Sequence, residues 1–248
     1  MPSARSIAEI VASMQAVDPT SPRLTWYGPD GERVELSGRV LANWVIKATN
    51  LLVSEGEVGP GSVVVVDLPV HWRALVWSVA AWLAGAQVQL LDDGGSGPVH
   101  PDVVVTWRPS ARPAEMGVDL SVAGTLVAVS LPALAMAFDG DLPSGAIDGS
   151  ADLMTYPDVL IMPPSSDPEA SALDDLEHAR LIEWALDTPM PDTPAPRVFV
   201  ATQDLAVALR TALGAWARGG SVVLVTDVRG GDALAHVAAV EGAAAPPA

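Results

Sequence analysis

Residues 62–91 read SVVVVDLPVHWRALVWSVAAWLAGAQVQLL, and this stretch decides the fold class. Its four consecutive valines, Val63–Val66, predict a strand over residues 62–67 that is buried on both faces. The apolar residues that follow predict a helix from about His71 to Leu83, which Gly85 ends, and residues 87–91 predict a second strand. A strand, a helix and a strand joined by short turns form a βαβ unit, which is typical of a parallel sheet.

The sequence on either side continues the alternation of strands and helices. Residues 24–27 and 33–36 flank Gly28-Pro29-Asp30-Gly31, a run of turn-forming residues, and predict a β-hairpin. Ser37 is expected to cap a helix whose apolar residues, Leu41 to Leu52, recur at spacings of three and four. Further strands are predicted over residues 102–107, 125–130, 197–201 and 221–226, and further helices over residues 4–17, 171–186, 203–217 and 232–240.

These elements predict an α/β fold in layers, with a mostly parallel sheet flanked by helices and an N-terminal β-hairpin. We expect residues 1–241 to form a single domain, in which the proline-rich link at residues 187–196 is the place for a subdivision. Residues 242–248 are expected to form a disordered tail.

Composition excludes several classes of protein. Thirteen basic residues against 30 acidic ones give a net charge of −17, which repels nucleic acid and anionic membranes. The absence of cysteine excludes disulfides, thiolate metal sites and a cysteine nucleophile. The N-terminus lacks a continuous apolar run, so we expect no signal peptide and a cytoplasmic protein. The uncharged run Ala74–Leu91 contains Gly85, Gln87 and Gln89, so a buried helix, a turn and a strand are expected there instead of a membrane span.

A series of short motifs resembles a known family. Val58-Gly59-Pro60-Gly61 opens the valine strand, Leu68-Pro69 follows it, and Leu83-Ala84-Gly85-Ala86 leads to Leu90-Leu91-Asp92. In this order they resemble the N-terminal portion of the adenylate-forming superfamily, which comprises acyl-CoA synthetases and peptide-synthetase adenylation domains. Residues 197–225 resemble a later segment of the same enzymes. Within that superfamily the chain is most similar to a small actinobacterial family of AMP-binding-enzyme-like proteins of unknown function.

The sequence departs from this family at the residues that carry its chemistry. The resemblance implies a glycine-rich loop ending in lysine, which holds the phosphates of ATP, but residues 92–197 contain no lysine. The family's ribose-binding aspartate motif and its mobile C-terminal domain with a catalytic lysine would lie beyond residue 248. We therefore expect no cofactor.

The candidate binding residues are four polar side chains at predicted strand and helix ends. Asp92 and Asp93 follow a strand, at the edge where open α/β sheets bind ligands. Gln203 and Asp204 begin a helix where, by resemblance, the superfamily places substrate-facing residues; the alternative for Asp204 is an acid favoured by the helix dipole. Gly94-Gly95-Ser96-Gly97 lacks a lysine and a following helix, so it predicts a surface loop.

Other polar residues predict neither a metal site nor a catalytic group. His71, His100, His178 and His236 show no paired metal spacing and are expected at the surface or as helix caps, and Lys47 is expected in solvent. Most of the eight tryptophans lie in apolar stripes, so they are expected first in the core and second as stacking partners of a ligand.

Two classes of function remain open from the sequence. The first is a non-catalytic, adenylation-like protein that binds a small molecule or a protein partner, or that assembles as a homo-oligomer. The second is an enzyme, either an acyl or aryl adenylate-forming component that needs a partner chain or an unrecognised hydrolase.

Overall fold

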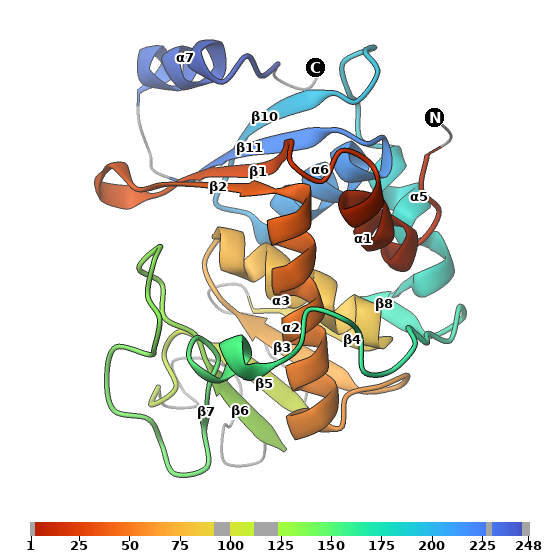
Figure 1. Ribbon diagram of the computed structural model, residues 1–248, viewed down its shortest axis with the longest axis vertical. Coiled ribbons are helices and arrows are strands. Elements are labelled where there is room, and N and C mark those ends of the chain that lie inside the picture. The colour runs from red at the N-terminus through yellow and green to blue at the C-terminus, as the bar shows by residue number, and fades with distance from the viewer. Residues whose placement is uncertain (1–2, 92–99, 112–123, 227–229, 245–248) are drawn as a thin grey trace. The chain divides into compact units, whose positions relative to one another are not determined.

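The computed structural model describes residues 3–91, 100–111, 124–226 and 230–244, whose strands form two sheets (Figure 1). Both sheets are mostly parallel and helices flank them, so the predicted α/β class is confirmed. In chain order the elements are α1 (Ile7–Ala16), β1 (Pro22–Tyr27), the 3-10 helix η1 (Pro29–Gly31), β2 (Arg33–Ser37), α2 (Gly38–Gly56), β3 (Val63–Asp67), α3 (Trp72–Ala84), β4 (Gln87–Leu90), β5 (Val103–Thr106), β6 (Thr125–Ala128), β7 (Ile147–Asp148), η3 (Asp152–Thr155), β8 (Ser171–Leu173), β9 (Leu176–Glu177), η4 (His178–Arg180), α5 (Leu181–Leu186), β10 (Arg197–Ala201), α6 (Leu205–Ala217), β11 (Ser221–Val225) and α7 (Gly231–Val240).

The chain divides into two compact units, each built on one sheet. One unit contains residues 1–42, 69–75 and 180–248, and the other contains residues 43–68 and 76–179. Helices α2 and α3 each begin in the first unit and end in the second. The single-domain organisation of residues 1–241 stays a prediction.

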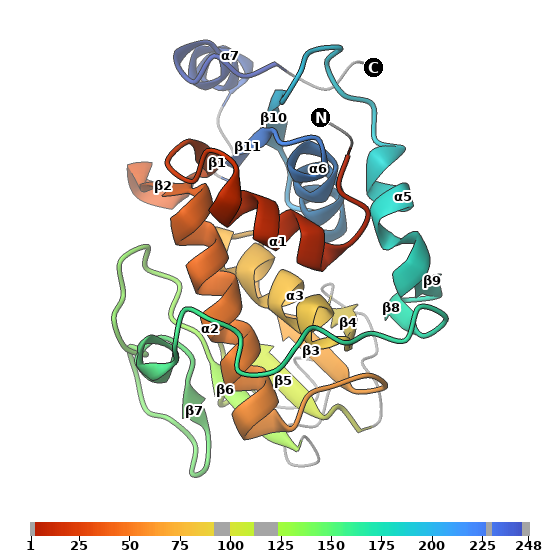
Figure 2. The same cartoon turned by 45° about the vertical axis from the view of Figure 1, so that its right-hand side comes forward.

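The first unit holds a four-stranded sheet in the order β10-β11-β1-β2. β10, β11 and β1 are parallel, and β1 and β2 form the predicted antiparallel hairpin. Figures 1 and 2 show α6 on one side of this sheet and α7 on the other. Val223 and Val225 of β11 pack with Val237 of α7, so the alternate side chains of β11 at these positions face α7.

Glu241 fastens the end of α7 to the four-stranded sheet. Its carboxylate lies 2.6 Å from Nη2 of Arg197 and 3.0 Å from Nη2 of Arg33, and it accepts a hydrogen bond from the Tyr27 hydroxyl at 2.5 Å. Although burial opposes ionisation, the hydrogen bonds from Tyr27, Arg197 and Arg33 lower the pKa of Glu241 below its usual value. A single carboxylate thus connects β1, β2 and β10.

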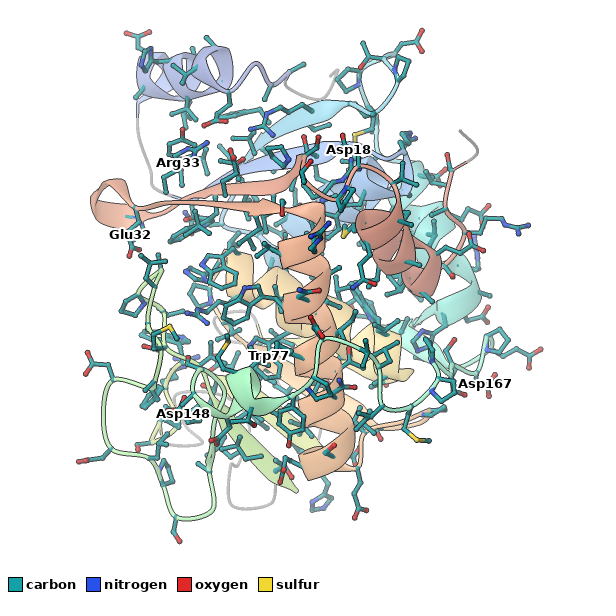
Figure 3. The ribbon with its side chains drawn as sticks, viewed as in Figure 1. Asp18, Glu32, Arg33, Trp77, Asp148 and Asp167 are labelled. Atoms are coloured by element: carbon teal, nitrogen blue, oxygen red, sulfur yellow. The ribbon has the colours of Figure 1, made fainter. Side chains whose placement is uncertain are left out.

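The second unit holds a seven-stranded sheet in the order β7-β6-β5-β3-β4-β8-β9. All neighbours are parallel except β8 and β9. Val64, Val65 and Val66 of β3 are fully buried, which confirms the strand predicted to be covered on both faces. Helices α2 and α3 cover one face of the sheet. Gly56 of α2 lies against Val103 of β5. Trp77 of α3, which is labelled in Figure 3, belongs to the buried core.

The helix predicted over residues 171–186 is wrong in its first half. Residues 171–177 instead form the short strands β8 and β9, and only residues 181–186 are α-helical. Asp174 adopts a positive φ of 49°, which a helix cannot contain, and Leu173 pairs with Val88 of β4. The indole N–H of Trp82 donates to the carbonyl oxygen of Ala172 at 2.8 Å. Pairing with a distant strand therefore overrides the local capping signal at Ser171.

A substitution at Gly85 tests how closely the turn after α3 packs against Ser165. Its φ is +92°, and a Cβ there would collide with the carbonyl oxygen of Ser165, whereas Gly61 has a φ of +91° and open space around it. We expect Gly85→Ala to lower the free energy of unfolding by about 3 kcal/mol, of which about 1 kcal/mol is backbone strain. Gly61→Ala, the matched control, should lose only the strain. Urea unfolding measures both, and equal losses would contradict the close approach.

Candidate functional site

The strand order of the seven-stranded sheet reverses at β3. The chain passes from β3 to β4 on one side, and the next strand, β5, returns to pair with β3 on the other. Open parallel sheets bind their ligands outside the carboxyl ends of the strands at such a switch point. Asp67 ends β3 and Thr106 ends β5, and the register places these two residues opposite each other. The carboxyl edge of β3 and β5 is therefore the candidate site.

An ion pair whose carboxylate is buried occupies this edge. Nε of Arg108 lies 3.0 Å from Oδ2 of Asp67, and Nη2 lies 2.8 Å from Oδ1, so the guanidinium binds the carboxylate through two nitrogens. The Thr106 hydroxyl donates to Oδ2 of Asp67 at 2.5 Å and accepts from the backbone N–H of Arg108 at 3.0 Å. The Asp67 side chain is 4% exposed and that of Arg108 is 30% exposed. The burial of Asp67 and the pairing through two nitrogens hold these charged groups in a defined geometry.

The chemistry of this edge favours binding over proton transfer. Asp67 receives hydrogen bonds from Arg108 and Thr106 on both oxygens, so its carboxylate is occupied as an acceptor. Trp107 lies between these partners in the sequence and is 44% exposed. Trp44 and Trp184 are partly buried. The other five tryptophans are buried as predicted: Trp26, Trp72, Trp77, Trp82 and Trp216. An exposed indole provides a flat apolar face on which a planar group can stack.

The structure describes two of the four candidate binding residues that the sequence nominated. Asp92 and Asp93 follow β4 but lie outside the residues that the structure describes. Gln203 and Asp204 lie in the unit of the four-stranded sheet, at the carboxyl end of β10. The Asp204 carboxylate accepts a hydrogen bond from the backbone N–H of Val207 at 3.0 Å and so caps α6. The side-chain amide of Gln203 donates to the carbonyl oxygen of Thr226.

A second polar group lies at the carboxyl ends of β1 and β11. The indole N–H of Trp26 donates to the Thr226 hydroxyl at 3.1 Å, and the Trp26 ring meets the His71 ring edge-on with centroids 4.2 Å apart. His71 is buried, and its Nδ1 accepts from the backbone N–H of Arg73 at 3.1 Å, so it acts as the predicted helix cap, at the start of α3. Trp26 and His71 were not nominated from the sequence as binding residues, because a tryptophan in a strand and a histidine before a helix are both typical of a core.

The prediction that Lys47 points into solvent was wrong. Its side chain is partly buried, and its ammonium donates to the carbonyl oxygens of Met154 and Tyr156. The hydroxyl of Tyr156 in turn donates to the carboxylate of Glu55 at 2.6 Å. The single lysine of the chain therefore fixes a segment of its own backbone.

Neither a metal cluster nor a membrane span is found in the described part of the chain. No group of three His, Asp or Glu side chains that could hold a metal ion occurs among residues 3–91, 100–111, 124–226 and 230–244. In the same ranges no helix combines the length and the apolar character that crossing a bilayer requires.

Comparison with known proteins agrees with the fold. An acyl-CoA synthetase from Brucella canis superposes on 94% of this chain with a TM-score of 0.73 and 16% identity. A coronafacic acid ligase from Pectobacterium brasiliense superposes on 90% with a TM-score of 0.68 and 11% identity. At these identities the likeness concerns the fold alone. It confirms the resemblance to the N-terminal portion of adenylate-forming enzymes at that level.

One curated protein is similar in sequence. It is the "TIGR03089 family protein" of Mycobacterium tuberculosis, with 34% identity over 154 residues, which are 61% of this chain. The similarity spans 60% of that protein, and the chain spans 45–46% of the two synthetase and ligase structures. No protein-family model matches the sequence.

Removing the cation from the pair of Asp67 and Arg108 tests its importance. We expect Arg108→Met to lower the free energy of unfolding by about 2 kcal/mol, because the carboxylate of Asp67 stays buried without its counter-charge. Arg5→Met, which removes a solvent-exposed partner of Glu9, should change it by less than about 0.5 kcal/mol. Urea unfolding of the two variants provides the comparison. If Arg108→Met were as harmless as Arg5→Met, the pair would not hold the edge.

The hydroxyl of Tyr156 should lose its proton at a higher pH than an ordinary tyrosine does. Burial and the hydrogen bond to Glu55 raise the pKa of Tyr156 from 10.0 to about 12. Because the unfolded chain loses this proton first, the stability that Tyr156 contributes is constant below pH 10 and is lost between pH 10 and 12.

Absorbance of the phenolate in a Tyr27→Phe background isolates Tyr156, since Tyr27 is the only other tyrosine. Glu55→Gln should bring its midpoint back toward 10. A midpoint at 10 with Glu55 in place would contradict the hydrogen bond.

Proposed function

We propose that this chain is a non-catalytic, adenylation-like protein that binds a ligand or a protein partner without activating ATP. Its fold is shared with an acyl-CoA synthetase and a coronafacic acid ligase. The observation that carries the proposal is the commitment of Lys47, the single lysine, to the carbonyl oxygens of Met154 and Tyr156. A transferring phosphoryl group needs positive charge aimed at its oxygens, and this ammonium is used elsewhere.

Six of the twelve arginines, like the lysine, are bound within the chain, whereas Arg5, Arg39 and Arg180 are exposed. Arg108 is paired with Asp67, and Arg33 and Arg197 are paired with Glu241. Arg23, Arg210 and Arg218 donate to backbone carbonyl oxygens. These side chains stabilise the two units, and a nucleotide would have to compete with each of those bonds.

The proposed ligand site is the edge formed by Asp67, Thr106, Trp107 and Arg108. The ion pair gives this edge a rigid, nearly neutral polar floor, and the exposed indole adds a face for stacking. A planar organic molecule fits this combination better than a triphosphate. A cytoplasmic location, which the lack of cysteine favours, is part of the same proposal.

A catalytic alternative is favoured by one observation, the share of the solved enzymes that the chain spans. It covers 45–46% of their length, so a second polypeptide segment could supply the missing groups. In that case the chain would be one component of an acyl or aryl adenylate-forming enzyme.

Exchange of pyrophosphate into ATP separates the two functions. With a panel of acyl and aryl carboxylic acids, we expect no exchange above the protein-free background, because the sequence contains no glycine-rich loop that ends in lysine. Calorimetric titration with MgATP should show no binding tighter than about 1 mM. Exchange by the chain alone, or a micromolar constant, would contradict the proposal. Exchange that appears only on adding a candidate partner protein would favour the catalytic alternative.

A further inference from the structure

Residues 154–162, which we term the apolar strap, cross α2 in the unit of the seven-stranded sheet. Both ribbon views show the segment after η3 lying across this helix (Figures 1 and 2). The strap follows β7, where Asp148 is labelled in Figure 3. Its sequence, MTYPDVLIM, combines large apolar residues with one aspartate.

A buried asparagine fixes the backbone of the strap. Asn50 of α2 is 1% exposed, and its amide nitrogen donates to the carbonyl oxygens of Pro157 and Val159 at 3.0 and 2.9 Å. Its amide oxygen accepts from the backbone N–H of Ile161 at 3.0 Å. Together with the Lys47 bonds to Met154 and Tyr156, these contacts satisfy backbone groups of the strap from the helix side.

The anchored backbone leaves large apolar side chains in solvent. Val159 is 66% exposed, Ile161 is 49% exposed and Met162 is 59% exposed. Folding normally buries such residues, and scattered exposed ones are common, but here three lie within four consecutive positions. We call these three side chains the patch. The patch is held in place before any partner arrives, so binding would not have to order it.

The charge of the strap and of the sequence before and after it indicates what could cover the patch. Lys47 of α2 is a cation beside the strap, but its ammonium is bound to the strap's carbonyl oxygens. Between Arg112 and Arg180 the sequence contains no lysine or arginine, while aspartate and glutamate recur throughout. Asp158 lies inside the strap and is exposed, and Asp139, Asp141 and Asp152 in the preceding segments are also exposed. A second copy of the chain, with its own charge of −17, would be repelled from this face. A partner with apolar side chains flanked by cations matches both features.

We propose that the apolar strap is a docking surface for a cationic, amphipathic segment of a partner protein. The apolar face of that segment covers Val159, Ile161 and Met162, and its lysines or arginines lie near Asp158. Methionine suits such a surface because its unbranched side chain adapts to the partner. This inference deepens the proposed function, since it rests on a binding role for the chain and names the class of partner.

The test uses a defined probe and the whole chain. The probe is a fluorescein-labelled helical peptide of leucine and lysine, with a counterpart in which glutamate replaces every lysine. Fluorescence anisotropy at physiological ionic strength should show binding of the lysine peptide and none of the glutamate peptide. The variant Val159→Ser/Ile161→Ser/Met162→Ser should weaken binding by roughly tenfold or more, because the apolar contact is lost.

A matched control removes exposed apolar residues elsewhere. Val17, Val207 and Val240 are 40%, 44% and 65% exposed and lie in the other unit, so replacing all three by serine should change the affinity less than about twofold. Circular dichroism and urea unfolding verify that both triple variants fold. Asp158→Lys, which leaves the apolar residues intact, provides an independent variant and should also weaken binding of the lysine peptide.

Three results would overturn the inference: no binding of the lysine peptide, equal losses in the strap and control variants, or a homodimer in light scattering that the strap variant abolishes. The last would assign the patch to a second copy. Pyrophosphate exchange by the chain would overturn the proposed function and leave the peptide result standing, so the two failures are distinguishable.

Discussion

Parallel pairing of the buried valine strands β3 and β5 is the constraint on which the site depends. Their backbone groups are shielded from water, so each must bond to a neighbouring strand, and the register is fixed by the residues buried on both faces. That register ends with Asp67 opposite Thr106. A carboxylate at this position is buried, and Arg108, two residues beyond the end of β5, compensates its charge. The switch point of the sheet thus becomes a fixed polar edge beside an exposed tryptophan.

Much of the fold could be read from the sequence because the informative patterns are local. The valine run, the hairpin turn before Arg33 and the apolar stripe of the helix after Asp204 each specify an element by themselves. The residues around Ser171 mislead for the same reason, since the pairing of Leu173 with Val88 and the bond from Trp82 to Ala172 involve partners more than 80 positions away. The division of the strands between two sheets also depends on distant pairing.

The candidate site was less accessible to sequence reasoning. Asp67 ends a buried strand, which was a signal available in the sequence, but the role of Arg108 appears only when β5 is placed beside β3. Lys47 was assigned to solvent because its helical position lies away from the apolar stripe, and nothing local to it reveals the strap that crosses α2. In both cases the charged group is explained by a long-range neighbour.

Lys47 and several of the arginines bind acceptors within the chain itself. Lys47 holds the strap, Arg108 holds Asp67, and Arg33 and Arg197 hold Glu241. Along the strap the exposed side chains are apolar and acidic.

A crystal structure of the chain grown with saturating MgATP tests this account most directly. We predict that the Lys47 and Arg108 contacts are retained and that no nucleotide density appears on either unit. A triphosphate held by displaced lysine or arginine side chains would contradict it.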